Sequence, residues 1–241
     1  MTPSGSNTKR ATGNPAGLVV GLIMAVASAI IPNLDSDSPV PGGAQPALAI
    51  TAEPEGPTTT EVEALLNQLE LAPEGPREGY VREAFKHWVD ADRDGCDTRK
   101  EVLIEESLIP ATQEAGCLVS AGEWFSPYDA TTFVAPGGLD IDHVVPLGEA
   151  WDSGASGWDS SRRQDYANDL DHPEALIAVS AASNRSKSDR DPAEWKPPNV
   201  GYWCQYVSDW VTVKVTWELS SDAAEVQALE EMLVTCEDES G

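Results

Sequence analysis

The sequence predicts a helix-rich α+β domain with a small strand hairpin at its centre and disulfide bonds that hold it. Three observations lead to this prediction: apolar residues at helical spacing in both end regions, short β-branched runs broken by turn residues in the middle, and four cysteines. A chain of 241 residues with 41% hydrophobic residues can bury a core. This composition excludes wholesale disorder, and the sequence shows neither a collagen repeat nor several membrane spans.

The net charge limits the functions that the protein can have. There are 15 Lys and Arg residues against 41 Asp and Glu residues, for a formal net charge of −26. Such a chain repels phosphates, which argues against generic adhesion to nucleic acid or anionic lipid. Six of the basic residues fall in one short stretch: Arg162, Arg163, Arg185, Lys187, Arg190 and Lys196. Any role in processing a polyanion must therefore depend on a local site.

The first 31 residues have the features of an export signal. They contain Lys9 and Arg10 and no acid, and an apolar run extends from Leu18 to Ile31. A basic start before an apolar run too short for a comfortable membrane span predicts a signal peptide over residues 1–31, with an uncleaved membrane anchor as the alternative. Two small-residue patterns, one at Ala27 to Ala29 and one at Ala47 to Ala49, leave the cleavage site open.

Residues 32–60 are rich in Pro, Gly and Thr and have no periodicity, so we interpret them as a flexible linker. The folded domain is expected over residues 61–241. The predicted location is secreted or associated with the cell envelope, with membrane contact only through an uncleaved leader.

The four cysteines predict two disulfides. Cys96, Cys117, Cys204 and Cys236 contain no Cys-x-x-Cys pair, which weighs against a structural zinc site, and an exported protein favours disulfides. Three connectivities exist for four cysteines. Closeness in the sequence favours Cys96 with Cys117 and Cys204 with Cys236.

Helical patterns occupy the first part of the domain. Thr60 and Glu63 match a capping box, and apolar residues from Val62 to Leu69 follow at helical spacing, which predicts a first helix. Apolar residues between positions 81 and 89 predict a second helix, and residues 98–108 suit a third.

The middle of the chain has strand patterns. Residues 118–134 are β-branched and aromatic residues interrupted by Gly, Pro and Asp, which predicts short strands and turns. Residues 139–145 alternate, so a regular strand would place Asp140 and Asp142 on one face and Ile141 and His143 on the other, unless a bulge changes the pleat. Residues 176–179 are a compact strand candidate.

Further helices are predicted around and after these strands. Ser160 can cap a helix through Ala167, and residues 181–188 suit one or two helical turns. The sequence from Asp191 to Glu194 has the cap, Pro and acid of a helix start. Residues 199–219 and 223–236 are typical of amphipathic helices, although residues 211–215 could equally form a strand.

Three ordered motifs carry a family resemblance. They are Leu-Asp-Ile-Asp-His-Val-Val-Pro at residues 139–146, Ala-Leu-Ile-Ala-Val at 175–179 and Ser-Asn-Arg-Ser-Lys-Ser-Asp at 183–189. The chain resembles the HNH (ββα-metal) endonucleases over about residues 78–236, most closely the secreted bacterial HNH proteins, and the HNH domain of RNA-guided CRISPR nucleases is also similar over two of these motifs. The resemblance implies a central ββα-metal hairpin-helix unit and an exported, metal-dependent endonuclease that hydrolyses phosphodiester bonds of nucleic acid, with DNA favoured.

The resemblance also implies roles for individual residues. His143 would be the general base, and Asp142 and Asn184 would bind a divalent metal. Two oxygen ligands, with the other positions left to water and phosphate, suit Mg²⁺ or Mn²⁺ better than Zn²⁺. Arg185 and Lys187 would contact phosphate oxygens.

One position departs from the family pattern. Many HNH proteins have an Asn at the start of the second strand, where this chain has Ala175, which puts alignment of the catalytic His in question rather than the reaction class. Asn168 or His172 is a candidate substitute. Asp140 is either an extra metal ligand, a group that supports the ligands, or a solvated strand carboxylate.

A second pattern suggests calcium. Residues 90–101 fit the spacing of an EF-hand loop, with Asp90, Asp92 and Asp94 at positions 1, 3 and 5 and Glu101 at position 12. Against this, position 8 is Asp97 instead of an aliphatic residue, and the chain offers no partner hand. The alternative is an acidic turn held by a disulfide at Cys96. A calcium ion here would be structural.

Two functions from different classes follow. The first is the exported HNH endonuclease, whose residues Asp142, His143 and Asn184 are all present. The alternative is a catalytically degenerate cell-envelope protein, with or without Ca²⁺ binding, that keeps an HNH fold; Ala175 and the net charge favour it. A nuclease toxin would use the same chemistry as the first. No protein partner is evident from the sequence.

Overall fold

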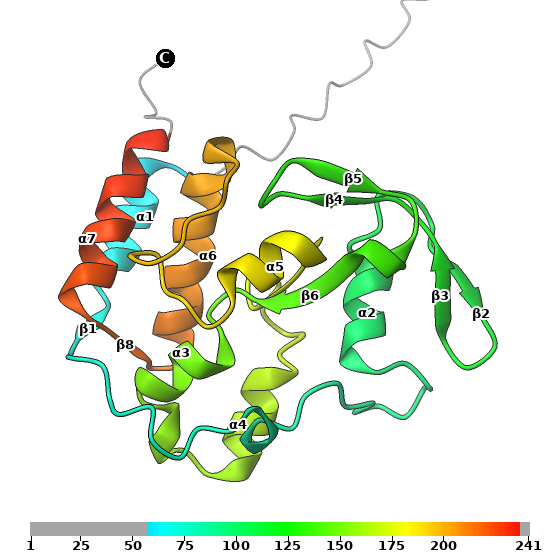
Figure 1. Cartoon of the computed structure of the whole chain (residues 1–241), viewed down its shortest axis with the longest axis horizontal. Coiled ribbons are helices and arrows are strands. Elements are labelled where there is room, and N and C mark those ends of the chain that lie inside the picture. The colour runs from blue at the N-terminus through cyan, green and yellow to red at the C-terminus, as the bar shows by residue number, and fades with distance from the viewer. Residues whose placement is uncertain (1–56, 237–241) are drawn as a thin grey trace, which may run out of the picture. The chain divides into compact units, whose positions relative to one another are not determined.

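A computed structural model describes residues 57–236 (Figure 1). The predicted signal peptide or anchor and nearly all of the predicted linker lie outside the described residues. The first described helix begins at Thr59, two residues before the predicted start of the domain. None of the helices in the described range is long and apolar enough to cross a membrane.

Short helices and strands alternate along the chain, in agreement with the predicted α+β class. The α-helices are α1 (Thr59–Leu66), α2 (Thr98–Glu105), α3 (Leu147–Asp152), α4 (Ser160–Ala167), α5 (Ala181–Lys187), α6 (Trp203–Thr216) and α7 (Ala223–Met232). The strands are β1 (Glu70–Leu71), β2 (Thr112–Glu114), β3 (Leu118–Ala121), β4 (Trp124–Ser126), β5 (Thr131–Phe133), β6 (Leu139–His143), β7 (Leu176–Ser180) and β8 (Ser220–Ser221).

The strands form four two-stranded sheets in the described residues. The longest pair is β6 with β7, antiparallel and in continuous register from Leu139 opposite Ser180 to His143 opposite Leu176. In Figure 1, α1, α6 and α7 pack together on one side, the β2–β3 and β4–β5 hairpins lie on the other with α2, and β6 and α5 lie between them. The β6–β7 pair is therefore the link between a helical half and a strand-rich half.

The core is centred on α6. Its buried side chains include Tyr206, Trp210 and Val213, which recur at helical spacing, and the helix packs against both α1 and α7. The run 211–215, which the sequence allowed as a strand, is therefore helix: β-branched residues tolerate a helix when packing buries them. Trp195 is also buried.

The predicted second helix is wrong. Between positions 81 and 89 the chain forms only a 3₁₀ turn, η1 (Arg82–Ala84), and Trp88 takes a left-handed conformation with φ of 59°. The apolar spacing has another cause, because Phe85 is fully buried in an aromatic cluster and Trp88 packs on His143. The side chain of Asn168 hydrogen-bonds to the amide of Val89 and the carbonyl of Lys86, so these backbone groups have partners without a helix.

Two helix starts differ from the prediction. The capping box uses Thr58 and Glu61, two residues before the predicted pair. Asp191 accepts bonds from the amides of Ala193 and Glu194, but no helix follows, because the next residues include Pro197 and Pro198, which stop propagation after one turn. The cap of α4 is Asp159 rather than Ser160.

Both favoured disulfides are present, Cys96–Cys117 and Cys204–Cys236. The first ties the loop before α2 to the start of β3, and the second ties the start of α6 to the residues after α7. Each disulfide closes a loop of the chain and stabilises the fold by lowering the conformational entropy of the unfolded state.

A buried ion cluster joins the helices of the helical half. The ammonium of Lys214 in α6 bonds to Glu149 in α3 at 2.8 Å and to Glu225 in α7 at 3.1 Å, and all three side chains are at most 2% exposed. Ser153 and the carbonyl of Ser220 complete its contacts at 2.7 and 2.8 Å. A buried charge needs such partners to offset its lost hydration.

We expect Glu106→Gln to stabilise the protein at high pH only. Glu106, just after α2, accepts a hydrogen bond at 2.8 Å from the backbone amide of Ala178 in β7. Burial raises the pKa of its carboxyl from 4.5 to about 7. Between these values the folded state keeps a proton that the unfolded state has lost, so this group makes stability fall as the pH rises through that window. Gln keeps the acceptor and cannot ionise.

Urea unfolding at pH 4 and pH 8 measures this effect. The variant should exceed the wild type by up to ~3 kcal/mol at pH 8 and by little at pH 4, since one pKa unit is about 1.4 kcal/mol. Glu105→Gln, at an exposed neighbouring position, is the control. Equal differences at both pH values would contradict the assignment.

Candidate active site

Strand β6 presents Asp142 and His143 to opposite sides, as regular pleating predicts. The carboxylate of Asp142 contacts Tyr128 and Lys187, whereas the imidazole of His143 contacts Ala167 at the end of α4. The register with β7 has no shift over this length, so no bulge changes the pleat. Both residues are buried, each at 4% exposure.

The imidazole of His143 is oriented by one carbonyl and two rings. Its Nε2 lies 3.0 Å from the carbonyl oxygen of Ala167, and the rings of Trp88 and Tyr166 lie at centroid distances of 5.7 and 6.4 Å. A carbonyl can only accept, so Nε2 carries the hydrogen and Nδ1 has the free lone pair. Burial lowers the pKa of His143 to about 3, so the ring is neutral near pH 7.

Lys187 does not face solvent, which corrects the prediction that it contacts phosphate. It is fully buried, and its ammonium bonds to Asp142 Oδ2 at 2.6 Å and to the carbonyl of His143 at 2.9 Å. Tyr128 donates to the same Oδ2 at 2.6 Å. Burial raises the pKa of Asp142, while the charge and hydrogen bond of Lys187 oppose that change. Lys187 therefore holds Asp142 and the end of β6 in place.

Helix α5 brings Asn184 and Arg185 beside Asp140. The amide nitrogen of Asn184 lies 3.4 Å from Asp140 Oδ2, and the guanidinium of Arg185 lies 3.5 Å from the same oxygen. The side chain of Arg185 is 75% exposed and that of Asp140 is 30% exposed. Asp140 is thus in contact with two α5 side chains rather than isolated in solvent, and the contact with Nδ2 leaves the amide oxygen of Asn184 for another partner.

One cavity brings most of these residues together. It has a volume of about 420 Å³ and is lined by Tyr80, Arg82, Ile141, Asp142, His143, Pro146, Leu147, Asn184, Arg185, Ser188 and Asp189. Four predicted site residues, Asp142, His143, Asn184 and Arg185, line it, whereas Asp140 and Lys187 do not. Tyr80, Arg82 and Asp189 were missed: the first two come from a segment far upstream that has no motif, and Asp189, the last residue of the third motif, was given no role.

Asn168 is the better placed of the two candidates for the role of the missing Asn. Ala175 is buried, and its carbonyl accepts a hydrogen bond at 3.0 Å from the amide of Val144, the residue after β6. Asn168 accepts from the amide of Val89 at 2.9 Å and donates to the carbonyl of Lys86 at 2.7 Å. Asn168 follows Ala167, whose carbonyl orients His143. Its hydrogen bonds therefore connect the loop that contains Trp88 to the chain beside His143. His172 instead pairs with Asp169.

The oxygen donors at the cavity fit a hard divalent cation. Asp142 offers a carboxylate whose Oδ2 is fixed by two donors, and Asn184 offers an amide oxygen. Oxygen ligands of this kind, completed by water and phosphate, match Mg²⁺ or Mn²⁺. The metal assignment stays a prediction.

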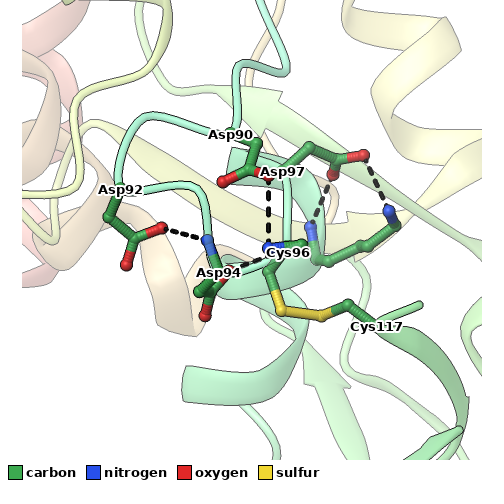
Figure 2. Close-up of a disulfide and its surroundings, with 8 residues drawn as sticks. Asp90, Asp92, Asp94, Cys96, Asp97 and Cys117 are labelled. Atoms are coloured by element: carbon green, nitrogen blue, oxygen red, sulfur yellow. Dashed lines mark hydrogen bonds and ion pairs between the residues drawn. A yellow bond between two sulfur atoms is a disulfide. The ribbon is translucent and has the colours of Figure 1, made fainter. Parts of the chain in front are cut away.

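The predicted calcium loop has its acids close together (Figure 2). One carboxylate oxygen from each of Asp90, Asp92 and Asp94 lies within 4.8 Å of the others, beside the Cys96–Cys117 disulfide. The loop also bonds to itself, with Asp90 accepting from Gly95 and Asp94 from Cys96. Glu101 is not part of this group, and burial and the nearby acids raise its pKa. In the described residues no α-helix lies directly before the loop, which follows the 3₁₀ turn η1. Calcium binding stays a prediction.

The described residues form a disulfide-bonded α+β protein with one cavity that holds most of the predicted site residues. Residues 85–232 match the family model described as GmrSD restriction endonucleases, C-terminal domain. The chain is also 43% identical over 187 residues to an uncharacterized secreted protein of Arthroderma benhamiae, covering 78% of this chain and 90% of that protein. No solved structure matches the chain.

This chain belongs to the GmrSD C-terminal domain family. The matched residues include β6, β7 and α5, so the cavity lies within the family region. The protein is secreted or associated with the cell envelope, as predicted, in agreement with its secreted relative. That relative is fungal, so the resemblance specifically to bacterial proteins stays a prediction.

Proposed function

We propose that this protein is an exported, metal-dependent endonuclease of the HNH type that hydrolyses phosphodiester bonds of nucleic acid, with DNA the favoured substrate. The observation that carries the proposal is the single cavity that Asp142, His143 and Asn184 line together. Strand β6 supplies the first two residues, and α5, which follows β7 directly, supplies the third. Membership in a family named for restriction endonucleases supports the same reaction class.

His143 is the general base of the proposed reaction. Its Nε2–H donates to Ala167, so Nδ1 is free to take a proton from water as the water oxygen attacks phosphorus. The pKa of about 3 keeps the ring unprotonated, but it also makes the imidazole a weaker base than one with a pKa near 7. The tilted ring of Trp88 and the stacked ring of Tyr166 restrict its rotation. The base is therefore oriented before substrate arrives, which lowers the entropic cost of reaching the transition state.

Asp142 and Asn184 are the proposed ligands of a divalent metal, Mg²⁺ or Mn²⁺. When bound, such an ion would stabilise the negative charge that develops on the phosphate and the leaving oxygen. Lys187 and Tyr128 fix the Asp142 carboxylate through Oδ2, and Asp140 contacts the amide of Asn184. Both ligands thus have partners that limit their movement, as the supporting contacts of metal ligands commonly do.

Metal-dependent nicking of supercoiled plasmid tests the proposal. The full-length protein with its disulfides formed should nick DNA with Mg²⁺ or Mn²⁺ and not with EDTA. Asn184→Ala should raise the metal concentration for half-maximal cleavage by at least ~10-fold, the usual cost of disturbing a metal site. Asn184 is preferable to Asp142 for this test, because removing the Asp142 charge would leave Lys187 buried and unpaired.

Asn67→Ala, at the exposed end of α1, is the matched control and should leave the metal requirement unchanged. A folded wild-type protein that is inactive on DNA and RNA with every divalent metal tried would contradict the proposal. That outcome would favour the alternative, a cell-envelope protein without turnover, and Ca²⁺ titration of the Asp90 loop would follow.

A further inference from the structure

Arg82 stands out among the basic residues of a very acidic protein. It lines the cavity with Asp142, His143 and Asn184, yet it comes from η1, about sixty residues before β6. Its side chain is exposed, and within the described residues it has no ion pair or side-chain hydrogen bond. Since acids outnumber bases 41 to 15, an arginine without an acidic partner at this position is available for an anion.

The other basic residues near the cavity already have partners. Lys187 is buried against Asp142, Arg185 lies 3.5 Å from Asp140, and Arg77 bridges Asp152 at 2.5 Å and Asp189 at 3.5 Å. The charge that could meet a phosphate at the cavity therefore comes from Arg82, together with the exposed part of Arg185.

The backbone on both sides of Arg82 is anchored. Phe85 is fully buried against Tyr166 at 6.0 Å, and the carbonyl of Ala84 accepts from Arg163 at 3.2 Å. On the other side, Tyr80 packs on Trp151 at 5.9 Å. A charge on an anchored segment loses less conformational freedom when it binds a ligand than one on a mobile loop.

The preceding chain is also held closely to α3. A Cβ at Gly148 would overlap the guanidinium of Arg77 and the carboxyl of Asp189. The glycine in α3 therefore allows the segment that contains Arg77 to lie directly against this helix. The salt bridges of Arg77 to Asp152 and Asp189 hold this segment in place. Arg82 is therefore presented at the cavity by a segment with contacts on each side of it.

Arg82 lines the same cavity as the proposed base and the proposed metal ligand. Burial is the main influence on the pKa of both Asp142 and His143, and the Arg82 charge acts on each of them as well. Because these four residues line one cavity, a phosphate bound there by Arg82 and Arg185 would lie close to the proposed base, His143, and the proposed metal ligand, Asp142.

We propose that Arg82 binds a phosphodiester group of the nucleic acid backbone at this cavity, together with Arg185, and replaces Lys187 as the second phosphate contact. This inference rests on the proposed function. Arginine suits the task because its planar donors match two phosphate oxygens at once. The contact is to the backbone and carries no base preference.

The test measures binding of a short labelled DNA duplex by fluorescence anisotropy, with Mg²⁺ present and in a His143→Ala background that leaves the duplex intact. Adding Arg82→Gln should weaken binding by about tenfold near 0.1 M salt and reduce the slope of log K against log salt by about 1, as expected for one lost phosphate contact. Arg82→Lys should recover part of the affinity. Arg93→Gln, which removes the same charge from an exposed loop outside the cavity, should change neither quantity.

Plasmid nicking with His143 intact separates failure of this inference from failure of the proposed function. If the wild type nicks DNA while Arg82→Gln and Arg93→Gln bind equally well, Arg82 is not a phosphate contact and the nuclease proposal stands. If the wild type neither nicks nor binds nucleic acid, both proposals fall. Circular dichroism confirms that each variant is folded.

Discussion

Replacing His143 with alanine should lower the rate of nucleic acid cleavage by about 10²- to 10⁴-fold, the usual contribution of a positioned general base. The imidazole is the neutral base at the cavity, and its Nδ1 is the free acceptor because Nε2–H is committed to Ala167. No other histidine lines this cavity in the described part of the chain. Initial nicking rates at saturating Mg²⁺ measure the effect.

His172→Ala is the matched control, because His172 lies in another pocket and pairs with Asp169. It should keep the wild-type rate within a few fold. His143 is buried, so its variant must also be shown to fold, by circular dichroism and by the two disulfides remaining closed. A folded His143→Ala protein that cleaves at the wild-type rate would remove His143 from the mechanism and, with it, the basis of the HNH assignment.

The largest loss of stability should come from Lys214→Met. This change leaves the carboxylates of Glu149 and Glu225 buried without their shared cation, and losing one partner of a buried ion pair typically costs about 3–5 kcal/mol. Burial already raises the pKa of Glu225 to about 7 with Lys214 present. Without the cation the Glu225 carboxyl would keep its proton to still higher pH in the folded state, so the loss should grow as the pH rises.

Urea unfolding of the oxidised protein at pH 6 and pH 8 measures this loss. Lys196→Met is the control: its partner Glu231 is exposed and lies at 3.1 Å, and surface pairs contribute about 0–1 kcal/mol. Adding Glu149→Gln and Glu225→Gln to Lys214→Met should restore part of the stability, because the unpaired charges are then absent. A loss below that of the control would mean that the cluster does not stabilise the fold.

Lys187 and Lys214 show why some site assignments could not be made from the sequence. Both were basic residues among many acids, and the motif around Lys187 predicted a phosphate contact. In the structure each is fully buried on a carboxylate far away in the chain. Whether a lysine faces solvent or the core depends on what packs over its helix, and no local pattern encodes that.

Local patterns did predict the features that depend on neighbouring residues. Alternation around residue 140 predicted β6 and the opposite faces of Asp142 and His143, and closeness in the sequence predicted both disulfides. The ordered motifs predicted that Asn184 would join these two residues, and one cavity contains all three. Such features follow from the strand repeat and from short-range spacing.

Only the tertiary structure decided the rest. The apolar residues near position 85 have helical spacing, yet they are buried by Tyr166 and His143 rather than by a helix of their own. The same packing brings Arg82 to the cavity and the carbonyl of Ala167 to His143. The sequence by itself determined the strand, the helix and the chemical groups of the candidate site, because these depend on residues a few positions apart. Contacts between distant segments determined which of those groups are exposed to a substrate, because burial is a property of the whole packed chain.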